Sequence, residues 1–164
     1  MPKTRVLIVI VAVVFGISMV TLYRSRGLIY DVLYPSPIIG AKAPKIELID
    51  NHKNIVELSQ FKGKTIYLHF MASWCHDCVN ELPKLQSYYN REKTNSDIVF
   101  LNVPFHEDEY VTRKFLQKKG YTLPVYADLN GATAKEYGVK GIPTTMIINK
   151  NGQVKKIILG VGKW

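Results

Sequence analysis

The chain has 164 residues, of which 47% are hydrophobic and 21% charged, a composition that suits one packed domain with an additional segment and excludes a disordered chain. Its formal net charge of +9 would suit a nucleic-acid-binding protein if the basic residues were clustered. Four of them flank an apolar segment at the start, and most of the remaining lysines are scattered among acidic residues, with one loose group at 150–163. No basic stripe interleaved with aromatic residues is visible, so the sequence does not favour nucleic-acid binding.

The first predicted element is a membrane helix. Residues Val6–Leu22 carry no charge over seventeen positions, and a helix of that length extends roughly 25 Å, near the lower limit for crossing a hydrocarbon core. A cleaved signal peptide is the alternative, because a basic start precedes the apolar run and Gly16–Ser18 is a weak cleavage site. Apolar residues continue past that site to an interfacial collar at 23–26, which favours a retained anchor over residues 1–26. Basic residues on both sides leave its orientation undecided.

Residues 27–44, with three prolines, are expected to form a linker, and residues 45–164 are expected to form one domain. Strand-like runs alternate with helical patterns, and an Asn-Gly pair predicts a final hairpin, so the domain is predicted to be a mixed α/β sheet flanked by helices. The expected extended segments are 45–49, 55–58, 65–71, 97–103, 123–126, 144–148 and 154–159. The expected helices start near Cys75 (burying Leu82, Leu85 and Tyr89), span 107–119 (burying Tyr110, Val111, Phe115 and Leu116, with a cap at Gly120) and span 132–137.

Both cysteines of the chain, Cys75 and Cys78, lie in the segment WCHDC at 74–78, directly after an apolar strand. Half of a zinc site is one interpretation, but zinc needs four ligands, and His52, His69, His76 and His106 would have to converge on the pair. His69 is expected instead to be a satisfied histidine of the core. A structural disulfide is a second interpretation, but a loop of two intervening residues removes little entropy from the unfolded chain.

A redox pair explains the spacing better. At the start of a helix, unpaired backbone N–H groups and the helix dipole stabilise a thiolate, which lowers the pKa of Cys75 and makes it the nucleophile. Cys78, almost one turn later, is close enough to resolve a mixed disulfide formed on Cys75. A cationic His76 would favour the thiolate, and Asp77 would oppose it.

Two further residues are candidates for the same site. Glu81 lies three positions after Cys78, so a buried carboxyl group there would be placed to accept the Cys78 proton; an exposed surface glutamate is the alternative. Pro143 begins a strand in the segment GIPTT and is a candidate cis-proline that leaves the preceding backbone free to pair with an extended substrate. An ordinary trans proline in a turn is the alternative.

At this point the chain resembles the thioredoxin superfamily, specifically its membrane-tethered TlpA/ResA/CcmG-like branch, over residues 39–160. The matching text is IGAKAPKIELID, FKGKTIYLHFMASWCHDCVNELPKL and DLNGATAKEYGVKGIPTTMIINKNGQV. By position, Cys75 resembles the attacking cysteine, Cys78 the resolving one, Glu81 the acidic residue beneath the site and Pro143 the cis-proline. Trp74 resembles the aromatic residue that packs beside the pair. Substrate contacts are expected at Trp74, His76, Asp77, Ile142 and Thr144.

The resemblance implies a thiol:disulfide oxidoreductase whose only redox group is the Cys75–Cys78 pair, with no bound cofactor and no metal. It also implies a single-pass protein of the cytoplasmic membrane whose domain lies on the periplasmic or extracytoplasmic side. Its partners would be a DsbD/CcdA-like membrane electron donor and oxidised envelope proteins such as apocytochrome c, and some relatives are tied to copper tolerance.

Three features depart from the family pattern. Met71 stands where a tryptophan is common, His76-Asp77 is an unusual pair between the cysteines, and the usual closing helix is absent after Gly160. Either the sequence is a shortened form or another surface covers that face of the sheet. The second alternative would expose apolar area and predicts self-association or a docked partner. A copper-binding or copper-delivery module using the two cysteines with a histidine or Met71 is the rival function. A peroxidase on the same fold is a third reading, disfavoured because both thiols belong to one pair.

Overall fold

The structure is a computed structural model that describes residues 2–33 and 37–164, with side chains described for residues 10–25 and 37–164. The chain divides into two compact units, residues 1–35 and 36–164. The first is one helix, α1 (Pro2–Leu33). Part of the predicted anchor (side chains 1–9) and of the predicted linker (34–36) lies outside the described residues. Within the described residues, no helix combines the length and apolar character required to span a membrane.

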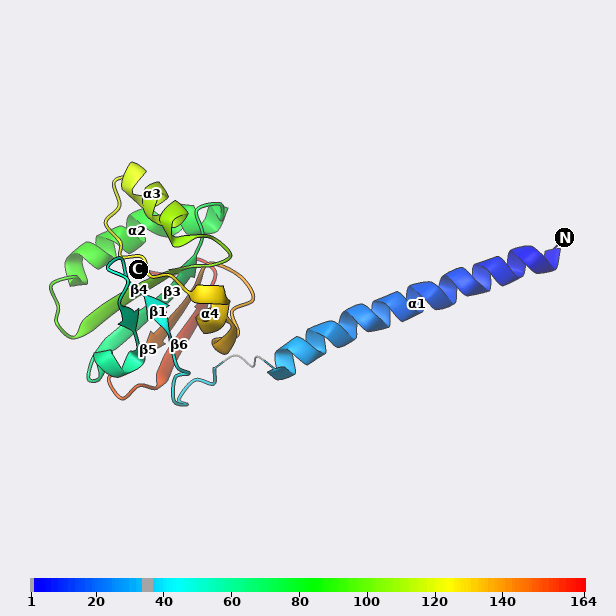
Figure 1. Ribbon diagram of the computed structural model, residues 1–164, viewed down its shortest axis with the longest axis horizontal. Helices are drawn as coiled ribbons and strands as arrows, with labels where there is room; N and C mark the ends of the chain where they lie inside the picture. The colour runs from blue at the N-terminus through cyan, green and yellow to red at the C-terminus, as the bar shows by residue number, and fades with distance from the viewer. Residues whose placement is uncertain (1, 34–36) are drawn as a thin grey trace. The chain divides into compact units, whose positions relative to one another are not determined.

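The second unit is built on a four-stranded mixed sheet in the order β4-β3-β5-β6 (Figure 1). Strand β3 (Thr65–Met71) lies in the middle, parallel to β4 (Ile98–Pro104) and antiparallel to β5 (Thr144–Ile148). Strand β6 (Val154–Leu159) follows β5 through the hairpin that the Asn-Gly pair predicted. The predicted mixed α/β sheet is therefore confirmed, and the bounds of three strands match those expected from the sequence.

The two faces of the sheet follow from the alternation of side chains along β3. Ile66, Leu68 and Phe70 belong to the core on one face, together with Tyr137, which directly follows helix α4 (Ala132–Glu136). Tyr67, His69 and Met71 face the other way, where Met71 packs with Leu82 of helix α2 (His76–Glu92). Because α2 lies on this second face, residues that α2 buries meet the odd-numbered residues of β3.

Three helices flank the sheet: α2 (His76–Glu92), α3 (Glu109–Lys118) and the short α4 (Ala132–Glu136). Helix α2 buries Leu82 and Leu85 as predicted. The prediction for α3 was partly wrong. Tyr110 and Val111 are exposed, and the helix instead buries Leu116 and Thr112, because the hydroxyl of Thr112 is bonded to Glu107 and needs no solvent.

Short elements complete the unit. The predicted strand 45–49 is reduced to β1 (Leu48–Ile49), which pairs with β2 (Ile55–Val56), and helical turns η1 (Leu58–Phe61) and η2 (Leu129–Gly131) follow. The expected strand 123–126 is not formed. Its continuation, Ala127, makes one isolated bridge to Ile49. These segments lie at the margin of the sheet, where few partners are available to lengthen them.

The end of α3 yields a stability prediction. Gly120 has φ +78° and follows the last turn, where its N–H donates to Gln117 and the N–H of Tyr121 donates to Leu116, closing a Schellman motif. We expect Gly120→Ala to lower the free energy of unfolding by about 1 kcal/mol because a Cβ disfavours this conformation. Gly141→Ala is the control, since Gly141 lacks a positive φ and has open space around it. Urea unfolding that gives equal effects would contradict the prediction.

Candidate active site around the Cys75–Cys78 disulfide

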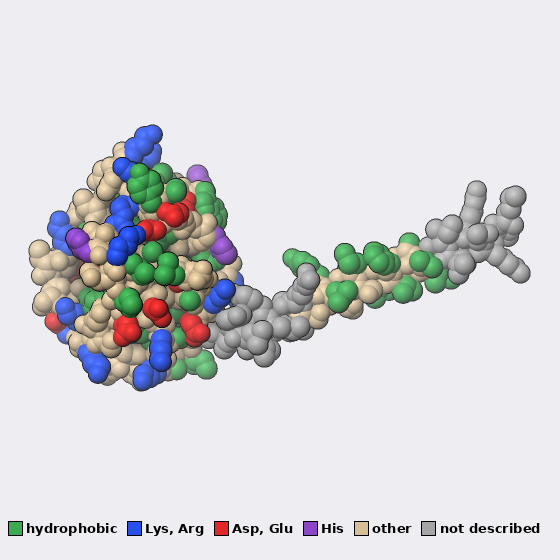
Figure 2. Space-filling model, in the orientation of Figure 1, with side chains coloured by type: hydrophobic (Ala, Val, Ile, Leu, Met, Phe, Trp, Pro, Cys, Tyr) green, Lys and Arg blue, Asp and Glu red, His purple; other side chains and the backbone are tan. Residues whose placement is uncertain are grey.

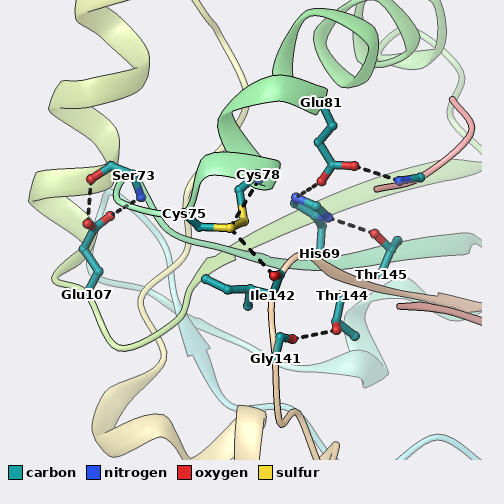
Figure 3. The surroundings of a disulfide bond; sticks show 11 residues. His69, Ser73, Cys75, Cys78, Glu81, Glu107, Gly141, Ile142, Thr144 and Thr145 are labelled. Atoms are coloured by element: carbon teal, nitrogen blue, oxygen red, sulfur yellow. Dashed lines mark hydrogen bonds and ion pairs between the residues drawn. A yellow bond between two sulfur atoms is a disulfide. The ribbon is translucent and has the colours of Figure 1, made fainter. Parts of the chain in front are cut away.

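The two cysteines lie at the junction of β3 and α2, Cys75 directly before the helix and Cys78 in its first turn. Cys75 is the N-cap residue of α2, and its Sγ accepts a hydrogen bond from the backbone N–H of Cys78 at 3.2 Å. The two sulfurs form a disulfide, with the Cα atoms 5.2 Å apart (Figure 3). Cys75 is 8% exposed and Cys78 is fully buried, so a partner can reach only the first sulfur directly. The helix start therefore supplies the N–H donor that the sequence predicted for the Cys75 sulfur.

A loop that precedes β5 faces the disulfide. The Ile142–Pro143 peptide bond is cis, and the Ile142 carbonyl oxygen lies 3.7 Å from Cys75 Sγ. A disulfide sulfur has no proton, so this contact can become a hydrogen bond only in the reduced protein. Thr144 was expected to contact substrate, but its side chain is buried and its hydroxyl donates to the Gly141 carbonyl at 2.7 Å. Its side chain shapes the loop instead, because its hydrogen bond is made inside the protein.

The same loop borders an open, mainly apolar groove. The groove has a volume of about 590 Å³ and lies between the segment before β5 and the end of β6. Its lining includes Gly141, Ile142, Pro143, Ile157 and Leu159. Leu159 is 78% exposed, so the groove offers apolar surface to a partner beside the sulfur pair.

The remaining predicted contact residues surround Cys75 from the α2 side. Trp74 is 62% exposed, and His76 and Asp77 at the helix start are also exposed. Trp74 thus presents its indole to solvent directly before the reactive sulfur. An exposed large aromatic side chain at this position is suited to contact with a partner protein.

Glu81 is buried beneath the pair, so the alternative of an exposed surface glutamate is wrong. Its Oε2 accepts hydrogen bonds from the backbone N–H of Gly162 at 2.9 Å and from Trp164 Nε1 at 3.1 Å. Burial raises the pKa of Glu81, and these two hydrogen bonds oppose the rise. Burial therefore stabilises the neutral form of the carboxyl group, and the two hydrogen bonds stabilise its charged form.

His69 of β3 lies on the other side of that carboxyl group. Its Nδ1 is 2.8 Å from the Thr145 hydroxyl, and its Nε2 is 3.4 Å from Glu81 Oε1 (Figure 3). Nε2 has no hydrogen-bond partner within the described part of the chain, so the predicted satisfied core histidine is satisfied at one nitrogen only. Burial lowers the pKa of His69 to about 4, which keeps the imidazole neutral at pH 7.

The buried imidazole makes stability depend on pH. Between pH 6.5 and about 4 the unfolded chain protonates His69 and the folded chain does not, so the contribution present above pH 6.5 is lost as the pH falls through that range. We expect a loss of about 3 kcal/mol. Urea unfolding at pH 7 and pH 4 would measure it as the difference between Glu81→Gln and Glu81→Gln/His69→Gln, a background without the Glu81 titration. Parallel pH profiles for the two variants would refute it.

Gly162 and Trp164 were not anticipated as site residues. The Trp164 indole packs against Tyr67, His69 and Tyr88, with ring centroids 5.9 to 6.4 Å apart. The face expected to lie open is thus partly covered by this segment. Its sequence signal is slight: a tryptophan that follows the short glycine-rich stretch 160–163.

Gly162 permits this packing, because a Cβ at that position would lie 2.7 Å from Trp164 Cε2. We expect Gly162→Ala to displace the indole and to red-shift the emission of Trp164, measured in a Trp74→Phe background. Gly141→Ala in the same background should leave the spectrum unchanged. An unaltered spectrum in the Gly162 variant would show that the indole does not depend on this glycine.

Glu107 is a second residue whose role the sequence did not give. Its carboxylate accepts hydrogen bonds from the Ser73 backbone N–H at 3.0 Å and the Ser73 hydroxyl at 2.6 Å, and from the Thr112 hydroxyl. The sequence predicted that a helix starts at Glu107; in the structure Asp108 caps α3 by accepting the Tyr110 N–H. Glu107 instead ties the loop before Cys75 to α3, so it fixes the approach to the reactive sulfur (Figure 3).

Metal binding was the main rival chemistry. Over the residues whose side chains are described, no group of three or more His, Cys, Asp or Glu side chains is arranged to hold a metal ion.

On the face shown in Figure 2, basic side chains are dispersed, with acidic side chains also present on the second unit.

Comparison with known proteins decides the family. The AhpC/TSA family matches residues 39–157, which is most of the chain. The chain belongs to the AhpC/TSA family. Within it, the chain is 32% identical to the thiol-disulfide oxidoreductase ResA of Bacillus subtilis over 149 residues, covering 88% of this chain and 82% of that protein.

Solved structures agree. A thiol:disulfide interchange protein DsbE from Chlorobium tepidum superposes with a TM-score of 0.68 at 31% identity, covering 77% of this chain and 89% of that one. StoA from Bacillus subtilis gives 0.63 at 26% identity, covering 75% and 93%. This member of the AhpC/TSA family thus has the predicted thioredoxin-like fold and is a thiol-disulfide oxidoreductase of the ResA/StoA/DsbE type with a CxxC pair.

Proposed function

We propose that the chain catalyses thiol-disulfide exchange by a two-step path through Cys75. The Cys75 thiolate attacks a disulfide of the target protein and forms a mixed disulfide; Cys78 then attacks Cys75 and releases the reduced target. The observation that carries this proposal is the Cys75–Cys78 disulfide at the start of α2, with the outer sulfur accepting the Cys78 N–H and the inner sulfur buried. The disulfide itself serves as the redox group, and no other cofactor is required.

Glu81 is proposed as the proton acceptor for Cys78. Both residues lie on one face of α2, three positions apart, and both are buried. A buried thiol ionises poorly without a nearby base, and a carboxyl group whose pKa is raised by burial is a stronger base than an ordinary one. Glu81 therefore activates the resolving step rather than the first attack.

The proposed target is an extended segment of a folded or unfolding protein. It would pass between Trp74 and Ile142, with the backbone next to Pro143 pairing with it and the apolar groove receiving a neighbouring side chain. His76 and Asp77, exposed beside Cys75, would contact the same segment.

The proposed location is the extracytoplasmic side of the cytoplasmic membrane, with residues 1–26 as a single-pass anchor. The uncharged stretch Val6–Leu22 and the resemblance to the membrane-tethered branch of the thioredoxin superfamily support this location. Electrons would come from a DsbD/CcdA-like membrane donor, and targets would be oxidised envelope proteins such as apocytochrome c or proteins damaged by copper stress.

Trapping the intermediate tests this function. Cys78→Ala removes the resolving thiol, so target proteins should accumulate as reductant-sensitive adducts on Cys75 and be identifiable by mass spectrometry. The matched control is Cys75→Ala/Cys78→Ala, which should trap nothing. Absence of adducts, with reduced Cys75 alkylated no faster than free cysteine at pH 7, would overturn the proposal. Tight stoichiometric Cu(I) binding without exchange activity would replace it with the copper-delivery function.

The direction of electron flow has its own test. Equilibration of the Cys75–Cys78 pair with glutathione buffers gives its reduction potential, and we expect a value on the reducing side of the glutathione couple. A potential of about −120 mV, the strongly oxidising end, would assign the protein as an oxidant instead.

A further inference from the structure

A row of buried polar side chains crosses the sheet on the face that α2 covers, and the proposed exchange reaction does not explain it. His69 of β3 lies directly opposite Asn102 of β4 and Thr145 of β5 in the strand register. All three are at most 2% exposed. Polar side chains in such a position reduce stability unless they are paired, so the row calls for a function.

The row meets Glu81 through one pair of atoms. His69 Nε2 and Glu81 Oε1 are 3.4 Å apart, and within the described residues neither atom has a hydrogen-bond partner. Glu81 Oε2, by contrast, already accepts from Gly162 and Trp164. A separation of 3.4 Å is long for a hydrogen bond, and a small rotation of the carboxyl group brings it into range. Oε1, which lies next to His69, is thus the oxygen that can bind and release a proton.

A neutral imidazole can satisfy Oε1 in either charge state of the carboxyl group. When Glu81 is ionised, Nε2–H donates to Oε1, and Nδ1 accepts the Thr145 hydroxyl proton. When Glu81 is protonated on Oε1, that O–H donates to Nε2, and Nδ1–H donates to Thr145 Oγ1. The threonine hydroxyl can play both parts because it is donor and acceptor at once. The 2.8 Å contact between Nδ1 and Oγ1 fits both arrangements.

We propose that His69 is a positioning residue that changes tautomer with the charge of Glu81, so that the buried carboxyl group takes up and releases the Cys78 proton without leaving an unpaired polar atom. This inference rests on the proposed role of Glu81. In the resolving step, Cys78 S–H gives its proton to the Glu81 carboxylate, and the Cys78 sulfur bonds to Cys75. The bond between Cys75 and the target sulfur breaks, and the target leaves as a thiolate.

Other groups around Glu81 and His69 determine the pH at which the His69 tautomer changes. From α2, the charge of Asp77 raises the pKa of Glu81; from the 162–164 segment, the Gly162 N–H and the Trp164 indole lower it. From β3, Tyr67 donates to or accepts from the Tyr88 hydroxyl, and burial raises its pKa, so it stays neutral. Asn102 of β4 carries no charge. Among these groups, only Glu81 and Cys78 change charge during the proposed exchange.

Nuclear magnetic resonance of the full chain with ¹⁵N- and ¹³C-labelled histidine reads the tautomer directly. His69→Phe assigns the His69 signals among the four histidines. In the disulfide form we expect Nδ1–H at the acidic end of a pH titration, where the Glu81 carboxyl group is protonated, and Nε2–H once that group has ionised. The ¹³C shift of the carboxyl group, in a sample also labelled on glutamate, follows the ionisation. Glu81→Gln, which cannot ionise, should hold one tautomer throughout. A single tautomer in the wild type while Glu81 titrates would overturn the proposal.

The kinetic test uses the pH profile of mixed-disulfide resolution, with a model peptide thiol on Cys75. His69→Phe removes the partner of Glu81 Oε1 in both charge states, and the ionised form loses more because a hydrogen bond to a charged oxygen is the stronger one. We expect the profile to move about one pH unit upward, so that resolution on its acidic limb slows about tenfold. His69→Gln keeps both a donor and an acceptor and should lie near the wild type. Alkylation of Cys75 should be equal in all three.

A His69→Phe profile that superimposes on the wild-type profile would refute the role of His69. Exchange activity would remain in that case, so this outcome differs from failure of the proposed function, in which the wild type itself would not resolve the mixed disulfide. The tautomer measurement needs no exchange activity and applies even if His69→Phe does not fold, because Glu81→Gln then identifies the His69 signals by their changed pH dependence.

Discussion

Cys75→Ser is expected to reduce thiol-disulfide exchange by at least about two orders of magnitude, because serine offers no thiolate at neutral pH. Cys75 provides the only sulfur of the pair that a partner can reach, since Cys78 is fully buried. Reduction of insulin by the dithiol form, followed by turbidity with a chemical electron donor, measures the loss.

Cys78→Ser is the informative partner of this variant. It keeps the attacking sulfur, so the first step should proceed and stop at a mixed disulfide, visible as a covalent adduct on a non-reducing gel. Residual multiple turnover above a few per cent in Cys75→Ser would contradict the assignment of Cys75 as the nucleophile.

Phe70→Ala is expected to lower the free energy of unfolding by about 3 to 5 kcal/mol. Phe70 is fully buried near the end of the central strand β3 and packs against the Tyr137 ring, so truncation leaves a cavity that the strand cannot close. Because native domains are stable by about 5 to 15 kcal/mol, this single change should remove a large part of the total.

Leu159→Ala serves as the control. Leu159 lies at the end of β6 and is 78% exposed, so its truncation should change stability by less than about 0.5 kcal/mol. Chemical unfolding of both variants gives the comparison. A loss below 1 kcal/mol for Phe70→Ala would contradict the prediction.

The sequence predicted the central fold well, for a local reason. Strand β3 is a nearly unbroken apolar run, and the β5–β6 hairpin carries an Asn-Gly turn, so local composition determines their bounds. The CxxC pair and the helix start were equally visible, because the cysteines, the strand and α2 are adjacent in the chain. Position relative to Cys78 made Glu81 a candidate, but it did not decide between a buried base and an exposed surface glutamate.

Contacts between distant segments could not be predicted in the same way. The hydrogen bonds from Gly162 and Trp164 to Glu81 join residues more than eighty positions apart, and those from Ser73 to Glu107 join two loops. The apolar face of α3 was misjudged because helical spacing fits Tyr110 and Val111, whereas burial of Thr112 depends on a partner outside the helix. In each case the deciding interaction is tertiary.

The attachment of Glu81 to residues 162–164 has a practical consequence for protein engineering. A shortened fragment that stops at the end of β6 keeps every strand and helix of the second unit and would be expected to express as a folded protein. It would nevertheless lack both N–H donors to Glu81 Oε2. The pKa of Glu81 in such a fragment would differ from its pKa in the full chain, so redox measurements on the fragment would not describe the full chain.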